Sequence, residues 1–167
     1  MATTYTLISS VTVGSGGAAN INFTSIPATY TDLLIKTSYR GDSANTAYDT
    51  SISFNGSSSN FAGKGIYGSG SAVNVQSIGN TPGLYVGANA TANTFSNGEY
   101  YIPNYTSSNY KSFSVDEVSE NNASTAYIYM NAMLWSQSAA ITSITLAPAI
   151  GNFVQYSTAY LYGISNA

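Results

Sequence analysis

The stretch Ala19-Asn20-Ile21-Asn22-Phe23-Thr24 alternates apolar and polar side chains. Successive side chains of a β-strand point to opposite faces, so this alternation is typical of a strand with one buried face. Ala19, Ile21 and Phe23 are therefore expected to point inward. The closing stretch Ala159-Tyr160-Leu161-Tyr162-Gly163-Ile164 also distributes its side chains across two faces, which predicts a final strand tied into the sheet.

Similar runs recur along the chain and predict a protein made mainly of strands. Residues 32–40 contain the continuous apolar centre Leu33-Leu34-Ile35, which indicates a central strand covered on both faces. Asn55-Gly56 predicts a tight turn. Glycines at 63, 65, 68, 70, 79, 83 and 87 interrupt the region 61–97, where irregular loops around short strands are expected. The other predicted strands are residues 5–9, 19–24, 48–55, 99–103, 111–119, 125–135, 140–147 and 157–164.

About ten strands, turn signals between them and no amphipathic helical pattern favour an all-β fold. We expect an antiparallel two-sheet sandwich with jelly-roll-like topology, and a closed barrel is the alternative. The clusters of Ser, Asn and Gly between the strands are short enough to be loops. Residues 1–167 are therefore expected to form a single β-sandwich domain.

The composition argues against catalysis. Of the 167 residues, 76 are Ser, Thr, Asn or Gly, four are Lys or Arg, seven are Asp or Glu, and none is His or Cys. Catalytic acids, bases, nucleophiles and metal ligands come almost entirely from the scarce or missing types. We expect no enzyme, no cofactor, no metal site and no catalytic residue. The cations Lys36, Arg40, Lys64 and Lys111 are too few to neutralise a row of phosphates, so nucleic-acid binding is not expected.

No segment has the roughly 20 consecutive apolar residues that a membrane-spanning helix needs. The most apolar run, residues 127–135, is interrupted by Asn131, so no membrane partner is expected. The first eight residues contain no basic side chain and no apolar core typical of a signal peptide, which favours synthesis in a cytoplasm. Because the chain has no Cys, packing of the core must hold the fold.

Three acidic residues, Asp116, Glu117 and Glu120, offer a paired-carboxylate hypothesis. Residues four apart in a strand share a face, so Asp116 and Glu120 could align while Glu117 points away. A glycosidase needs two carboxylates commonly about 5 to 10 Å apart. The favoured interpretation is instead that all three are solubilising charges at a strand end, next to a turn at Glu120-Asn121-Asn122.

Two further motifs have simple structural explanations. Arg40-Gly41-Asp42 is the tripeptide associated with integrin recognition, but Gly and Asp also favour turns, and Arg and Asp can form a surface ion pair. Asp42, Asn45 and Asp49 could offer oxygen ligands to calcium, although such a site needs six to eight oxygens. Cell adhesion and calcium binding are both disfavoured.

The chain has 15 Tyr and one Trp. Tyr100-Tyr101 and the pair Tyr127 and Tyr129 could line a protein interface or a platform on which sugars stack, because tyrosine supplies contact area at low entropy cost. The alternative is that these rings pack the sandwich with their hydroxyl groups at its edges. Trp135 ends the most apolar run and is expected in the core.

Seven short stretches form a pattern that covers nearly the whole chain. They are Thr6-Leu7-Ile8, Ile26-Pro27-Ala28-Thr29-Tyr30-Thr31-Asp32-Leu33, Phe54-Asn55-Gly56, Tyr101-Ile102-Pro103-Asn104-Tyr105, Glu120-Asn121-Asn122-Ala123, Ala140-Ile141-Thr142-Ser143-Ile144-Thr145-Leu146 and Tyr160-Leu161-Tyr162-Gly163-Ile164. In them the chain resembles a family of small virion structural proteins of tailed phages, notably marine and cyanobacterial ones. The resemblance implies a virion component of jelly-roll type and carries over no catalytic residue.

The resemblance and the composition together predict a virion structural protein. We expect a capsid decoration or cement protein, assembled in the host cytoplasm, that binds the outside of the shell as a small homo-oligomer. Its partner would be the major capsid protein or another virion protein. The alternative is a tail-fibre or receptor-binding domain that recognises host glycans through Tyr and Asn side chains. A third hypothesis, a glycan hydrolase built on Asp116 and Glu120, is disfavoured.

Overall fold

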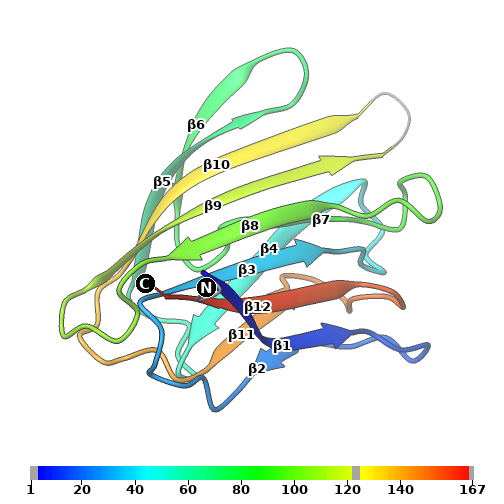
Figure 1. The fold of residues 1–167 in the computed structure, drawn as a ribbon. Helices are drawn as coiled ribbons and strands as arrows, with labels where there is room; N and C mark the ends of the chain where they lie inside the picture. Colours follow the sequence, from blue (N-terminus) through cyan, green and yellow to red (C-terminus); the bar gives the residue numbers. More distant parts are fainter. Residues whose placement is uncertain (1–3, 122–124, 166–167) are drawn as a thin grey trace.

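The computed structural model describes residues 4–121 and 125–165, and in these ranges the chain forms twelve β-strands and no helix. The strands form two antiparallel sheets that pack face to face (Figure 1), which confirms the predicted all-β sandwich. The large sheet contains, in spatial order, β1 (Tyr5–Thr12), β12 (Thr158–Ile164), β3 (Asp32–Ser38), β8 (Asn97–Ile102), β9 (Lys111–Glu120), β10 (Ala126–Trp135), β5 (Phe61–Gly68) and β6 (Val73–Ile78). The small sheet contains β2 (Ile21–Phe23), β11 (Ile144–Pro148), β4 (Ala47–Phe54) and β7 (Gly83–Val86).

Four strands of the large sheet lie in front of the small sheet in Figure 1. Their order, β1-β12-β3-β8, corresponds to the order β2-β11-β4-β7 of the small sheet. Each strand and its counterpart are consecutive in the sequence: β1 and β2, β11 and β12, β3 and β4, and β7 and β8. Two hairpins, β5–β6 and β9–β10, instead extend the large sheet beyond β7, the edge strand of the small sheet. This extension lies at the top of Figure 1.

The hydrophobic core lies between the sheets. Ile21 and Phe23 of β2 are buried in it, as the alternating pattern predicts. The inward position predicted for Ala19 is wrong, because β2 begins only at Ile21 and Ala19 is exposed. In β3, the run Leu33-Leu34-Ile35 is buried throughout, and the strand lies between β12 and β8, which confirms a central strand covered on both faces.

An aromatic cluster joins the two sheets. The ring centroid of Phe54 in β4 lies 5.3 Å from Phe61 in β5, 5.4 Å from Phe113 in β9 and 5.3 Å from Trp135 in β10. The contacts with Phe113 and Trp135 are edge-to-face, a favoured arrangement of aromatic rings. Trp135 is buried, so its predicted place in the core is confirmed.

The turn predicted at Asn55-Gly56 is confirmed. Phe54 and Ser57 exchange two backbone hydrogen bonds of 3.1 and 2.9 Å across it. Both central residues have positive φ, 52° for Asn55 and 76° for Gly56, which is the conformation that an Asn-Gly hairpin turn requires. The turn therefore sets the end of β4, which carries Phe54 into the aromatic cluster.

The irregular loops predicted for 61–97 are wrong for β5 and β6, which are strands of eight and six residues. The glycines of β5 lie beside large inward side chains of β10. A Cβ atom at Gly65 would overlap the side-chain Oδ1 of Asn131, and one at Gly63 would overlap the sulfur of Met133. These glycines therefore make room for neighbouring side chains and do not interrupt the strand.

Replacing Gly65 with Ala is expected to destabilise the fold by about 1 to 3 kcal/mol, the usual cost of overpacking a filled interior. Urea unfolding followed by circular dichroism measures this change. Gly79→Ala is the matched control, because a Cβ atom there meets no atom within 4 Å. Equal stability of the two variants would contradict the role assigned to the glycines of β5.

Candidate functional site: the outer face of the large sheet

The three acidic residues of β9 lie on two faces. Asp116 and Glu120 are exposed on the outer face, and Glu117 is buried on the inner face, as their spacing predicts. Four residues of extended strand span about 13 Å, which is longer than the separation of carboxylates in glycosidases. The structure therefore does not bring these residues together as a catalytic pair. The turn predicted at Glu120-Asn121-Asn122 extends beyond the described residues.

The interpretation of Glu117 as a solubilising charge is wrong. Its carboxyl group is buried between the sheets and accepts hydrogen bonds from the backbone N–H of Leu84 (2.9 Å), the hydroxyl of Tyr100 (3.1 Å) and the hydroxyl of Thr37 (3.3 Å). Burial raises the pKa of Glu117 to about 8, although these hydrogen bonds lower it in part. Because Leu84 lies on the edge strand β7, the carboxyl group joins the small sheet to β9 of the large sheet.

The raised pKa of Glu117 makes stability depend on pH. The unfolded chain loses this proton near the ordinary pKa of 4.5, whereas the folded chain keeps it up to about pH 8. The folded state therefore binds more protons between these values, and the free energy of unfolding falls by up to about 1.4 kcal/mol per pH unit as the pH rises through this window.

Glu117→Gln is expected to remove this slope and to be more stable than the wild type at pH 8. Urea unfolding between pH 4 and 9 measures the effect, and Glu120→Gln on the exposed face is the control. A wild-type stability that rises across the window would contradict the assignment.

The candidate tyrosines do not form one platform. Tyr100 is buried in the core beside Glu117, whereas Tyr101 lies on the outer face and donates a hydrogen bond of 2.8 Å to Asp32. Tyr127 and Tyr129 alternate with the exposed residues of β10 and share its inner face. The hydroxyl of Tyr129 donates to Asp49 of β4 (3.3 Å), so Tyr129 contacts the small sheet.

The tripeptide Arg40-Gly41-Asp42 is held within the fold. The Arg40 guanidinium donates to backbone carbonyls of the loop 88–94, including Thr91 (2.8 Å). The Asp42 carboxylate accepts from the backbone N–H of Asn152 (2.7 Å). Asp42 and Asp49 have different partners, and no group of three or more His, Cys, Asp or Glu able to hold a metal ion occurs within 4–121 and 125–165.

Several stretches that carry the phage resemblance meet through hydrogen bonds. The Tyr105 hydroxyl donates to the carbonyl of Pro27, and the backbone N–H of Ile141 donates to the carbonyl of Tyr105 (3.0 Å). The side chain of Asn55 accepts from the backbone N–H of Thr142 (2.8 Å) and donates to the carbonyl of Ala140 (2.7 Å). These residues connect loops to one another, so this part of the pattern maintains the fold and does not mark a site.

The functional feature that the sequence reasoning missed is the outer face of β10. Every outward side chain of this strand is apolar, and Ile128, Met130 and Leu134 are 48%, 50% and 36% exposed. The neighbouring strands continue this surface. We call it the apolar patch, and it consists of Ile66, Val73, Val75, Ile128, Met130 and Leu134. The apolar run 127–135 could have indicated this surface, because a strand that is apolar on both faces is typically covered on both sides.

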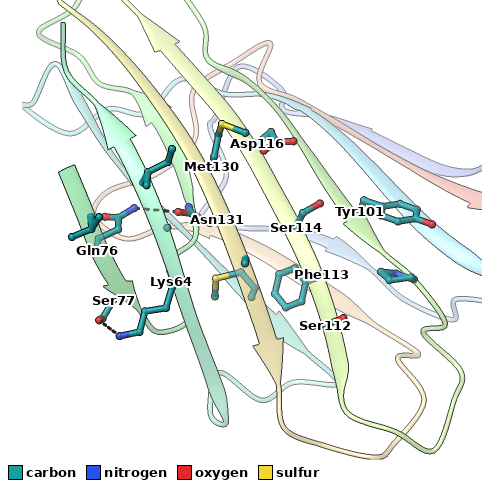
Figure 2. A pocket seen from close by; sticks show the side chains of 16 residues that line it. Lys64, Gln76, Ser77, Tyr101, Ser112, Phe113, Ser114, Asp116, Met130 and Asn131 are labelled. Atoms are coloured by element: carbon teal, nitrogen blue, oxygen red, sulfur yellow. Dashed lines mark hydrogen bonds between the residues drawn. The ribbon is translucent and has the colours of Figure 1, made fainter. Parts of the chain in front are cut away.

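A shallow groove of about 980 Å³ crosses the outer face, and Ile66, Val75 and Met130 of the apolar patch are part of its lining. Its lining includes the small side chains of Ser112, Ser114 and Ala132, and Figure 2 shows Ser114 between Met130 and Tyr101. Lys64 and Asp116 also line the groove. The Lys64 ammonium donates to the hydroxyl of Ser77 (2.5 Å), and neither Lys64 nor Asp116 forms an ion pair with another described residue.

Exposed tyrosines gather on the opposite part of the same face. Tyr5, Tyr101 and Tyr160 are 56%, 37% and 38% exposed. Between them the Lys36 ammonium forms an ion pair with the Glu99 carboxylate across β3 and β8. We call Tyr5, Leu7, Tyr101 and Tyr160 the tyrosine end of the face. The whole outer face thus offers apolar and aromatic contact area together with charged groups at Lys36, Glu99, Lys64, Asp116 and Glu120, a mixture that suits binding.

No protein-family model and no curated protein matches the chain. In the described part of the chain, no helix is long and apolar enough to cross a membrane. The functional conclusion therefore depends on the surface chemistry of the sandwich and on the resemblance noted in its sequence.

Proposed function

We propose that the protein is a structural component of a phage virion, a decoration or cement protein that binds the outside of the capsid. It acts by binding and performs no catalysis. The observation that carries this proposal is the exposed apolar and aromatic outer face of the large sheet, since a surface of this kind marks a site of interaction with another macromolecule. The partner is the major capsid protein or another virion protein.

The opposite surface of the sandwich has a different character. Asn22, Thr145 and Ser53 occupy adjacent positions across β2, β11 and β4 on the outer face of the small sheet. Thr145 donates a hydrogen bond of 2.7 Å to Asn22, so neutral polar groups bond to one another along this face. A subunit with large apolar groups on one face and hydrated neutral groups such as Asn22, Ser53 and Thr145 on the other suits a layer that docks on a shell and presents its other side to solvent.

The topology and the composition also support the proposal. The matching orders β1-β12-β3-β8 and β2-β11-β4-β7 are those expected for a rolled pair of antiparallel sheets, the jelly-roll arrangement of many viral proteins. A net charge of only −3 limits repulsion when many copies lie close together. Docking at symmetry-related positions multiplies a small contact over the particle.

The first test is the copy number and position of the protein in purified virions, measured by quantitative mass spectrometry and cryo-electron microscopy. Hundreds of copies distributed over the shell are the expected result, because a decoration protein follows capsid symmetry. Virions that lack the protein should be less resistant to heat and osmotic shock. Absence from the virion, or unchanged resistance of virions without it, would contradict the proposal.

A glycan-recognising tail or receptor-binding module is the second candidate. The observation in its favour is the tyrosine end, where exposed rings lie near the paired charges of Lys36 and Glu99. Sugars stack on such rings and bond to neighbouring polar groups. This candidate predicts glycan-array binding that Tyr160→Ala abolishes and that Tyr156→Ala, at an exposed site outside the strands, preserves. A few copies at the tail would favour it over capsid decoration.

A further inference from the structure

We infer that the apolar patch binds the same patch on a second copy of the chain and forms a two-fold symmetric dimer. The inference rests on the proposed function only in assigning the outer face of the large sheet to binding, and it specifies which part of that face self-associates. The patch lies over β10, β5 and β6, at the end of the sheet away from the tyrosine end (Figure 1).

The alternation along β10 is the first argument. Its inward residues Asn131, Met133 and Trp135 are buried by the sandwich, while its outward residues Ile128, Met130 and Leu134 remain exposed in one chain. On the neighbouring strand β6, Val73 and Val75 are 74% and 85% exposed. Large apolar side chains exposed on three neighbouring strands form a contiguous surface that a partner protein is expected to cover.

Charge complementarity identifies the partner as a second copy. Lys64 on β5 and Asp116 on β9 lie on opposite sides of β10, opposite Ala132 and Met130 in the strand register. Within one chain they are two strands apart, about 10 Å or more, and they form no ion pair. A two-fold axis parallel to the strands and between β10 and β5 places β10 of one copy over β5 of the other and β6 over β9, so that the two patches meet. Each Lys64 then lies within reach of Asp116 of the second copy, and symmetry forms this ion pair twice.

The shape of the face suits this arrangement. The small side chains of Ser112, Ser114 and Ala132 leave the groove beside Met130, and a second sheet packing face to face can fill it with its own side chains. Met130 is unbranched and adapts to an irregular contact. The dimer thus buries apolar groups at its centre and places one charged pair on each side of them.

The available area is of the same order as that of a stable dimer interface. Four adjacent strands about 4.8 Å apart and about eight residues long cover roughly 500 Å² in flat projection, and projecting side chains raise the accessible area above this value. A stable interface buries about 800 Å² on each partner. This is about a tenth of the 7928 Å² accessible surface of the chain.

Sedimentation velocity on the full chain between about 1 and 200 µM tests the inference. We expect a species of twice 17.4 kDa whose fraction rises with concentration. Met130→Asp should weaken the association at least about tenfold, because it places a carboxylate at the centre of the interface. Ser53→Asp on the outer face of the small sheet is the matched control and should leave the association unchanged. Circular dichroism and thermal unfolding verify that both variants are folded.

A charge swap separates the proposed pairing from a general loss of apolar contact. Lys64→Asp alone and Asp116→Lys alone each place like charges together across the dimer and should weaken it. The double variant Lys64→Asp with Asp116→Lys restores opposite charges and should recover most of the association. Additive weakening in the double variant would overturn the pairing and the two-fold geometry.

A wild-type chain that stays monomeric over the whole concentration range would overturn the inference. If Met130→Asp then prevented incorporation into virions, the patch would belong to the contact with another virion protein. The outcomes separate the inference from the proposed function. If the protein dimerises but is absent from virions, the inference holds and the proposed function is wrong. If the protein is monomeric but is present on the capsid, the proposed function holds and the inference is wrong.

Discussion

The buried carboxyl group of Glu117 helps to close the free edge of the small sheet. A strand edge exposes backbone N–H groups that usually require another strand. The N–H of Leu84 on the edge strand β7 instead donates to Glu117 on β9, so the large sheet itself closes this edge. The small sheet stops after four strands, while the large sheet continues through β10, β5 and β6. The extension is held by its own strand pairing and carries the apolar outer face.

The extended part of the large sheet carries the surface to which we assign binding. Its inner face is filled in part by its own side chains, because Asn131 and Met133 lie beside the glycines of β5, and Asn131 donates to the carbonyl of Pro82 (2.6 Å). Its outer face carries large apolar side chains without a partner inside the molecule. A rigid strand scaffold thus presents a contact surface with little flexibility to lose on association, which favours affinity without dedicated polar anchors.

Much of the fold could be predicted from the sequence because one-faced strands alternate visibly. The patterns of β2 and β12, the apolar centre of β3 and the Asn55-Gly56 turn each express a local rule, and each agrees with the structure. The predictions that failed depend on contacts between residues that are distant in the sequence. The glycines of β5 indicate loops unless the side chains of β10 are known to lie beside them. The burial of Glu117 likewise depends on β7, which is distant along the chain. The apolar face of β10 was visible in the sequence, but its exposure depends on the absence of any described segment packed on the outer side of the large sheet.

The neutral outer face of the small sheet has a consequence for behaviour in salt. Dissolved ions screen charged groups over about 8 Å at physiological ionic strength and over shorter distances in brine, whereas they do not screen the hydration of hydroxyl and amide groups. Asn22, Ser53 and Thr145 carry no charge that could be screened. A surface hydrated in this way keeps its interaction with water as salinity changes. Particles coated with it would remain dispersed in media where charge-stabilised colloids flocculate.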